Sequence, residues 1–123
     1  MAQPGAPQVQ LFGYEDSQPT RAALRFFRER RVPIHFVDLR KRPIAPGELR
    51  RFLERLGPEH LLDRDGKAFK AANLAWLRLE PDDIAERLLA DPRLLRLPLV
   101  RRGNHLTAGP AEQTWKEWLR AAQ

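Results

Sequence analysis

VQLFGYEDSQPTRAALRFF, residues 9–27, is the stretch that decides the fold. Its opening apolar run ends at Gly13 and predicts a short β-strand over Val9–Phe12. A polar loop follows, and apolar residues then return at helical spacing, namely Ala23, Phe26 and Phe27. This spacing predicts a helix from about Thr20 to Arg31, with Ser17 or Thr20 as its N-cap.

A second strand is expected directly after this helix. Pro33 closes the helix, and apolar Ile34 and Phe36 alternate with their neighbours over Ile34–Asp38. A strand, a helix and a strand within about 30 residues form a βαβ unit, which crosses over right-handed and makes its two strands parallel.

The middle of the chain reads as helical. A helix that begins at Pro46 and ends at Gly57 carries an apolar stripe made of Leu49, Phe52, Leu53 and Leu56. A short helix near Lys67–Asn73 and another over Pro81–Ala90 are expected to follow.

The C-terminal part predicts a hairpin and a last helix. Strands over Leu99–Arg102 and His105–Thr107 are joined by Gly103-Asn104, residues that accept the positive φ angles of tight hairpin turns. The last helix is expected to start near Pro110 and to bury Trp115, Trp118 and Leu119. The order β-α-β-(α-α-α)-β-β-α predicts an α/β protein with a four-stranded mixed sheet, in a thioredoxin-like arrangement with a helical insertion.

The length and the composition favour one globular domain. We expect residues 8–123 to form it, after a flexible tail of Pro, Gly and small residues at positions 1–7. No apolar run approaches the roughly 20 residues of a membrane helix, and the N-terminus lacks the features of a signal peptide. These features predict a cytoplasmic protein with no membrane contact.

The formal charge of +6 comes from 22 basic and 16 acidic residues. The basic residues are scattered and often stand beside acidic ones, as in Arg28-Glu29-Arg30-Arg31. This pattern favours a solvated, ion-paired surface over a nucleic-acid-binding patch, so direct nucleic-acid binding is not expected. The alternative predicts an affinity that falls steeply with added salt.

The chain contains no cysteine. Disulfides, thiolate nucleophiles and thiolate metal ligands are therefore excluded together, because each needs sulfur. The three histidines, His35, His60 and His105, stand far apart and lack the spacing of metal ligands. We therefore expect neither a metal site nor a cofactor.

Four segments resemble the ArsC/Spx family of arsenate reductase-like, thioredoxin-fold proteins, in the same order and at compatible spacing. They are residues 9–27, APGELRRFLERLG at 45–57, DGKAFKAANL at 65–74 and ADPRLLRLPLVRRGNHLTAGPAE at 90–112. The resemblance covers nearly the whole chain from Val9 to Leu119. It implies the thioredoxin-like fold, related to that of glutaredoxins, and a cis peptide bond before Pro98.

The position of the family's reactive Cys is occupied by Ser17, four residues before an Arg that Arg21 matches. Thr20 stands where Spx-like members have a second Cys. A serine hydroxyl ionises too weakly to replace a thiolate without a general base, and no motif places a His beside it. We therefore expect Ser17 to be a helix cap or a remnant of the lost Cys. An engineered replacement is disfavoured, because Thr20 and Leu97 also depart from the family pattern.

The oxyanion-binding positions that the resemblance implies also differ. Reductases of the family carry an Arg before the Pro of the third strand and another before the Pro that opens the last helix. This chain has Leu97-Pro98 and Gly109-Pro110 at these places. Arg96 lies one position earlier and would point to the other face of an extended segment. Arg64 is the candidate for the family's remaining Arg, which lies in the insertion.

Two functions stay open. The first is a non-catalytic protein-binding or regulatory module, for which the Spx resemblance implies RNA polymerase as partner and a groove between the loop and the proline as binding site. The second is an arsenate reductase or glutaredoxin-like oxidoreductase homologue with residual activity, in which an external thiol such as glutathione acts on a small oxyanion. The missing cysteine favours the first. The candidate binding residues are Tyr14, Ser17, Thr20, Arg21, Arg64, Arg96, Leu97 and Pro98.

Overall fold

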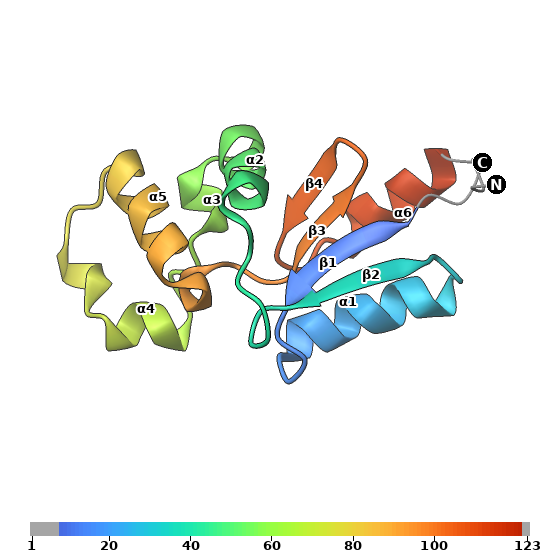
Figure 1. Ribbon diagram of the computed structural model, residues 1–123, viewed down its shortest axis with the longest axis horizontal. Helices are drawn as coiled ribbons and strands as arrows, with labels where there is room; N and C mark the ends of the chain where they lie inside the picture. Colours follow the sequence, from blue (N-terminus) through green and yellow to red (C-terminus); the bar gives the residue numbers. More distant parts are fainter. Residues whose placement is uncertain (1–7, 122–123) are drawn as a thin grey trace. The chain divides into compact units, whose positions relative to one another are not determined.

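The computed structural model describes residues 8–121, so the tail predicted over residues 1–7 lies outside the described residues. The predicted α/β class and the order of the main elements are confirmed (Figure 1). The elements are β1 (Val9–Gly13), α1 (Gln18–Glu29), β2 (Ile34–Asp38), α2 (Pro46–Leu56), α3 (Pro58–Leu61), α4 (Lys67–Ala71), the 3₁₀ helix η1 (Leu74–Trp76), α5 (Pro81–Ala90), the 3₁₀ helix η2 (Pro92–Leu94), β3 (Leu99–Arg102), β4 (His105–Ala108) and α6 (Glu112–Ala121).

Two compact units make up the described chain. One contains the described part of residues 1–42 and 97–123 and holds the sheet with α1 and α6. The other, Pro43–Arg96, contains α2 to η2 and no strand longer than a single bridge. The single domain over residues 8–123 stays a prediction. Among residues 8–121, no helix combines the length and the apolar character that a membrane span requires.

The sheet has four strands in the order β2-β1-β3-β4. β1 pairs in parallel with β2, which places Leu11 opposite Phe36, and antiparallel with β3, which places Leu11 opposite Val100. β3 and β4 pair antiparallel. The predicted mixed sheet is therefore confirmed, and its βαβ unit brings the C-terminal ends of β1 and β2 together.

One face of the sheet is covered by both α1 and α6. The Trp115 ring of α6 lies with its centroid 5.4 Å from that of Phe26 and 5.2 Å from that of Phe27, both on α1. These rings join Val9, Leu11 and Val100 of the sheet in one buried cluster. Trp115 and Trp118 are buried as predicted. Leu119 is only half-buried, because it packs against the margin of this cluster.

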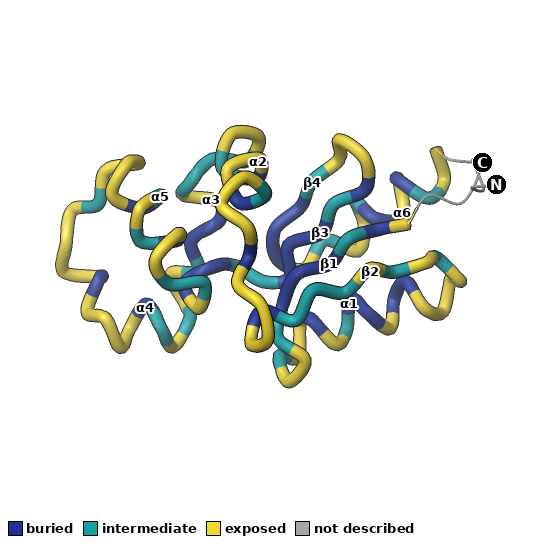
Figure 2. The backbone as a smooth tube through the Cα atoms, viewed as in Figure 1, coloured by how far each residue is buried: buried dark blue, intermediate teal, exposed yellow. Residues whose placement is uncertain are grey.

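The boundaries of α1 and α6 differ from the predicted ones by a few residues. α1 ends at Glu29, two residues early, because Arg31 takes a left-handed conformation with φ of 58°. α6 begins at Glu112 and not near Pro110, because its first backbone bond joins the Trp115 amide to the Ala111 carbonyl. In Figure 2 the buried residues follow β1 and β3, whereas the edge strand β2 is half-buried or exposed.

The helical unit holds three short elements that were not predicted, α3, η1 and η2. Each has four residues or fewer, which is too short for an apolar period to show in the sequence. α2 follows the prediction, with Pro46 in its first turn and Gly57 at its end with φ of 86°. α4 stops at Ala71, because Asn73 turns the chain with φ of 57°.

The hairpin and the proline before it also match the prediction. Arg102 pairs with His105 across the two-residue loop, in which Gly103 takes a φ of 61°. The Leu97-Pro98 peptide bond is cis, as the family resemblance implies.

Candidate functional site

Ser17 is the N-cap of α1, as one of the predictions states. Its backbone is extended (φ −81°, ψ 129°), and its Oγ accepts a hydrogen bond from the Thr20 amide at 3.4 Å. Its own amide donates to the Tyr14 carbonyl at 3.0 Å, and its carbonyl accepts from the Arg21 amide at 2.9 Å. The Ser17 side chain, which the resemblance places at the reactive Cys position, therefore caps the helix terminus.

Removing this cap gives the first testable prediction. We expect Ser17→Ala to lower the free energy of unfolding by about 1 kcal/mol, because the Thr20 amide loses its acceptor. Ser17→Asp restores an acceptor and should recover most of the loss. Urea unfolding followed by circular dichroism measures both, and an alanine variant as stable as the parent would show that the 3.4 Å bond contributes nothing.

The loop between β1 and α1 is held by two arginines that meet at Asp16. Arg21 donates from Nη1 to the Asp16 carbonyl at 3.3 Å, and Arg40 donates from Nη2 to Asp16 Oδ2 at 2.7 Å. The Arg40 guanidinium also lies 5.3 Å from the centroid of the Tyr14 ring. Arg21, the match to the family's Arg, is thus engaged with the backbone of the loop.

Sequence reasoning missed Asp16 and Arg40. They stand 24 residues apart, and no local pattern links them. The only signal was the parallel pairing of β1 with β2, which brings the segments after the two strands to the same edge of the sheet.

Thr20, at the position of the second Cys in Spx-like members, is fully buried. Its Oγ1 has no hydrogen-bond partner among the described residues. The side chain lies against Gly13, where an added Cβ would come within 2.5 Å of Oγ1. This position is therefore a packed contact between α1 and the end of β1, with no opening for a ligand on the Gly13 side.

The unpaired hydroxyl gives the second prediction. We expect Thr20→Val to leave the free energy of unfolding unchanged or to raise it by up to about 1 kcal/mol, because a buried hydroxyl without a partner carries a desolvation cost. The matched control is Thr107→Val. The Thr107 hydroxyl accepts from Trp115 Nε1 at 2.9 Å, so its loss should cost about 1–3 kcal/mol. Equal losses in the two urea-unfolding experiments would mean that Thr20 has a partner after all.

Leu97 and Pro98 lie at the same end of the sheet as the loop. Phe12 pairs with Leu99, so one further step of this antiparallel register places Pro98 opposite Gly13, where the loop begins. The Pro98 carbonyl accepts from the Gly109 amide at 2.9 Å. Pro98 is buried and Leu97 is half-buried. The structure thus brings six of the predicted site residues to one end of the first unit: Tyr14, Ser17, Thr20, Arg21, Leu97 and Pro98.

Arg64 belongs to the helical unit and forms a bidentate ion pair there. Its Nε and Nη2 atoms lie 3.0 and 2.6 Å from the two carboxylate oxygens of Glu59. The hydrogen bonds from Arg64 lower the pKa of the Glu59 carboxyl, and those same bonds raise the pKa of the Arg64 guanidinium. The guanidinium also lies 5.6 Å from the centroid of the Phe69 ring. The positive charge of Arg64 and its Nε and Nη2 donors are therefore paired with Glu59 inside this unit.

Arg96 is tied to the segment around α3. Its Nε donates to the His60 carbonyl at 3.0 Å and its Nη2 to the Leu62 carbonyl at 3.3 Å. Its amide donates to the Leu61 carbonyl at 2.7 Å, next to the isolated bridge between Leu62 and Leu95. The guanidinium therefore bonds two carbonyls and the backbone amide a third, which gives Arg96 a structural role within its own unit.

Comparison with known proteins settles the family. The family model described as "ArsC family" matches residues 12–118. The chain belongs to the ArsC family. The structure is similar to those of the YffB protein (TM-score 0.83, 23% identity, covering 91% of this chain and 99% of that one), of an arsenate reductase from Vibrio cholerae (0.76, 17%, 91% and 98%) and of an ArsC-related protein from Brucella melitensis (0.72, 22%, 96% and 99%). No curated protein matches the chain.

The chemistry available to this ArsC chain follows from its side chains. Its sequence has no thiol, and in residues 8–121 no histidine is recorded in contact with the Ser17 hydroxyl. His35, the histidine of β2, has its Nδ1 3.3 Å from Gln10 Nε2. Within the same residues, no three His, Asp or Glu side chains gather as a metal-binding group. Among residues 8–121, the Ser17 hydroxyl caps α1 and has no histidine beside it that could act as a general base.

Proposed function

We propose that this ArsC-family chain is a non-catalytic module that acts by binding another protein. The observation that carries the proposal is the absence of cysteine from the whole sequence, and it is supported by the capping role of Ser17, the residue that the resemblance places at the reactive Cys position. A thiolate can attack and later leave, whereas a capping hydroxyl with no base beside it does neither. The chain keeps the fold of the ArsC family but contains no cysteine sulfur.

The loop and the cis proline supply the candidate binding groove. Tyr14 and Leu97 are partly exposed, and both belong to segments that begin at the same end of the central strands. Arg40 and Arg21 hold the loop through Asp16, so the loop is ordered before a partner arrives. Order before binding lowers the entropic cost of association. RNA polymerase is the first partner to test, because the chain resembles Spx-like proteins.

The third prediction tests the enzyme alternative. We expect no arsenate reduction above the protein-free rate with glutathione as external thiol, because no side chain of the chain can hold a thiol-linked intermediate. Ser17→Cys should give a thiol that reacts with iodoacetamide but still no turnover, since Leu97 and Gly109 stand where reductases carry arginines. Turnover by the parent chain that Arg21→Ala abolishes would contradict the proposal.

The binding itself is tested with purified RNA polymerase on a biosensor surface. We expect the parent chain to bind and Tyr14→Ala to weaken the binding at least tenfold, because a half-buried aromatic side chain on an ordered loop is a typical anchor. Arg55→Ala, an exposed change on α2, serves as the control and should bind like the parent. Absence of binding by the folded parent chain would exclude RNA polymerase as the partner.

A further inference from the structure

β2 is an edge strand with one neighbour in the described chain. The sheet order places β1 on one side of it and no strand on the other. Its residues are half-buried or exposed throughout, in contrast to the buried centre of the sheet (Figure 2). An edge of this kind presents unpaired backbone donors and acceptors, which can pair with a strand from another chain.

The backbone bonds show which groups face outward. The Val9 amide donates to the Pro33 carbonyl at 3.0 Å, and the Leu39 amide donates to the Gly13 carbonyl at 2.9 Å. In a parallel ladder the bonded residues alternate, so His35 and Val37 direct their backbone groups toward β1. The amide and carbonyl groups of Ile34 and Phe36 therefore face the open edge.

This edge lacks the usual features that block pairing. Ile34–Asp38 contains no Lys, no Pro and no recorded bulge, and Ile, Phe and Val favour extended backbone. The strand ends at Asp38, whose carbonyl accepts the amides of Lys41 and Arg42 at 3.0 and 3.1 Å. The open edge is thus long enough for a short added strand. It ends at Asp38, because the carbonyl of this residue is already hydrogen-bonded within the chain.

The side of the edge that faces α1 is a hollow with a small excess of positive charge. It has a volume of about 340 Å³ and contains the apolar Leu24 and Phe36. Its charged lining consists of three basic residues and two acidic ones, namely Arg21, Arg25, Arg28, Glu15 and Glu29. These arginines follow one another along one side of α1. Within the described residues, Arg25 and Arg28 form no ion pair within 4.0 Å, so both guanidinium groups can pair with a partner's carboxylates in preference to the more distant Glu15 and Glu29.

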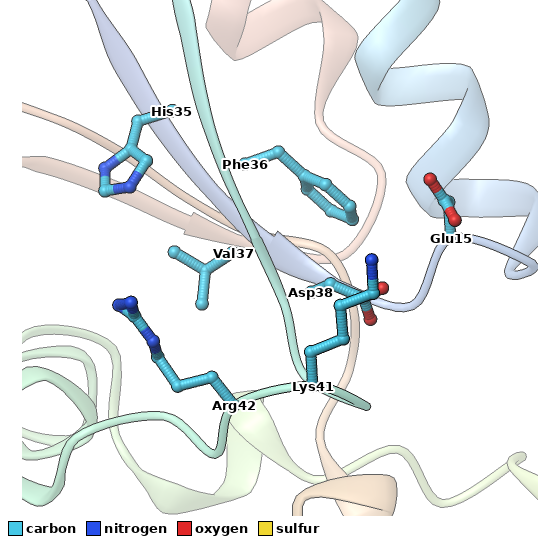
Figure 3. A pocket seen from close by; sticks show the side chains of 7 residues that line it. All are labelled: Glu15, His35, Phe36, Val37, Asp38, Lys41 and Arg42. Atoms are coloured by element: carbon cyan, nitrogen blue, oxygen red, sulfur yellow. The ribbon is translucent and has the colours of Figure 1, made fainter.

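A second hollow of about 280 Å³ lies along the edge itself and is lined by residues from both sides of the strand (Figure 3). Figure 3 shows His35, Val37 and Arg42 on one side of the strand, and Phe36 with Glu15 on the other. Arg42 brings positive charge to the side of His35 and Val37, whereas Lys41 lies on the side of Phe36, near Asp38 (Figure 3). In the described part of the chain neither forms a recorded ion pair, while the Asp38 carboxylate accepts the Arg40 amide at 3.0 Å.

We propose that the open edge of β2 binds an extended acidic segment of another protein as an added strand. The inference rests on the proposed binding function and gives that function a second surface, with a defined partner chemistry. The outward groups of Ile34 and Phe36 pair with the partner's backbone, and its carboxylates meet Arg25 and Arg28 on one side and Arg42 on the other. A peptide suits this edge better than a nucleic acid, because alternating donors and acceptors match another strand, whereas phosphates offer acceptors only.

The experiment uses a fluorescein-labelled ten-residue peptide of repeated Glu-Glu-Val-Val, which places carboxylates on both faces of the added strand, with fluorescence anisotropy as the readout. Arg25→Glu/Arg28→Glu should weaken its binding at least tenfold. The matched control, Arg50→Glu/Arg51→Glu on α2, makes the same change in net charge at exposed positions of the other unit and should change binding less than twofold. Equal losses in both double variants would overturn the proposal in favour of an effect of net charge.

Two further arms test strand pairing itself. The peptide N-methylated at alternate residues keeps its charge but loses the amides that face β2, and it should bind at least tenfold more weakly. The Phe36 amide should exchange with solvent more slowly in the complex. A single-stranded oligodeoxynucleotide that displaces the peptide with equal affinity, or an N-methylated peptide that binds unchanged, would overturn strand addition.

The result of the peptide experiment can be distinguished from that of the RNA polymerase experiment. A chain that binds polymerase through Tyr14 but ignores the peptide refutes the β2 surface and leaves the proposed function standing. A chain that binds the peptide but not the polymerase supports the β2 surface and excludes only that partner.

Discussion

We expect Trp115→Ala to lower the free energy of unfolding by about 3–5 kcal/mol, the largest effect of any single change considered for this chain. Trp115 is 1% exposed, and its ring packs against Phe26 and Phe27 of α1. Its indole N–H donates to the Thr107 hydroxyl at 2.9 Å. The truncation removes contacts that join α6 to α1 and to β4, so both the cavity and the unpaired Thr107 hydroxyl add to the loss.

A matched tryptophan is available as control. Trp76 in η1 is 88% exposed, so Trp76→Ala should change the free energy of unfolding by no more than about 0.5 kcal/mol. Trp115→Phe should fall between the two, because it keeps most of the ring contacts and loses the hydrogen bond. Urea unfolding should be followed by far-ultraviolet circular dichroism, because each variant loses a tryptophan and its fluorescence therefore differs from that of the parent. Equal stability of Trp115→Ala and Trp76→Ala would refute the packing described for α6.

The parts of the fold that local rules govern were predictable from the sequence. Pro33 and Pro46 mark element boundaries by their missing amide, and Gly103 marks the hairpin by its positive φ. The apolar period places Trp115 and Trp118 on the buried side of α6. Such features need only neighbours along the chain, and the family resemblance then added the cis bond before Pro98.

The contacts of the candidate site were not predictable in this way. The ion pair of Asp16 with Arg40 depends on the pairing of β1 with β2, and no single segment contains it. The bonds from Arg96 to the carbonyls of His60 and Leu62 span more than 30 residues. A sequence shows that an Arg is present, but its partner is set by tertiary structure. The assignment of Arg64 and Arg96 as ligands for an oxyanion therefore stays a prediction that their present bonds do not favour.

The two positions at which the resemblance places cysteines have structural roles of different kinds here. The Ser17 hydroxyl accepts a hydrogen bond from a backbone amide at the helix terminus, and a thiol would be a weaker acceptor there. Thr20 fills space beside Gly13, where a branched side chain adds packing without a hydrogen bond. Because both side chains contribute to the junction between β1 and α1, restoring a Cys at either place changes stability as well as chemistry. The Ser17→Cys experiment therefore needs its unfolding curve beside its activity.

The junction between β1 and α1 gives the second prediction with a large expected effect on stability. We expect Gly13→Ala to lower the free energy of unfolding by about 1–3 kcal/mol, because the core at this point has no room for a methyl group. Its Cβ would lie 2.5 Å from Thr20 Oγ1 and 2.8 Å from Thr20 Cγ2. Thr20 is fully buried and β-branched, so it has no alternative rotamer that clears both contacts at no cost.

A second substitution shows whether this contact is the cause. Thr20→Ala removes both clashing atoms, so Gly13→Ala should cost less in the Thr20→Ala background than in the parent, with a coupling energy of about 1 kcal/mol or more. Gly47→Ala is the control: its Cβ would meet nothing within 4 Å, and as a helical position it should gain about 0.5–1 kcal/mol. If Gly13→Ala were as harmless as Gly47→Ala, or if the two changes at the junction were strictly additive, Thr20 would not be the residue that keeps position 13 a glycine.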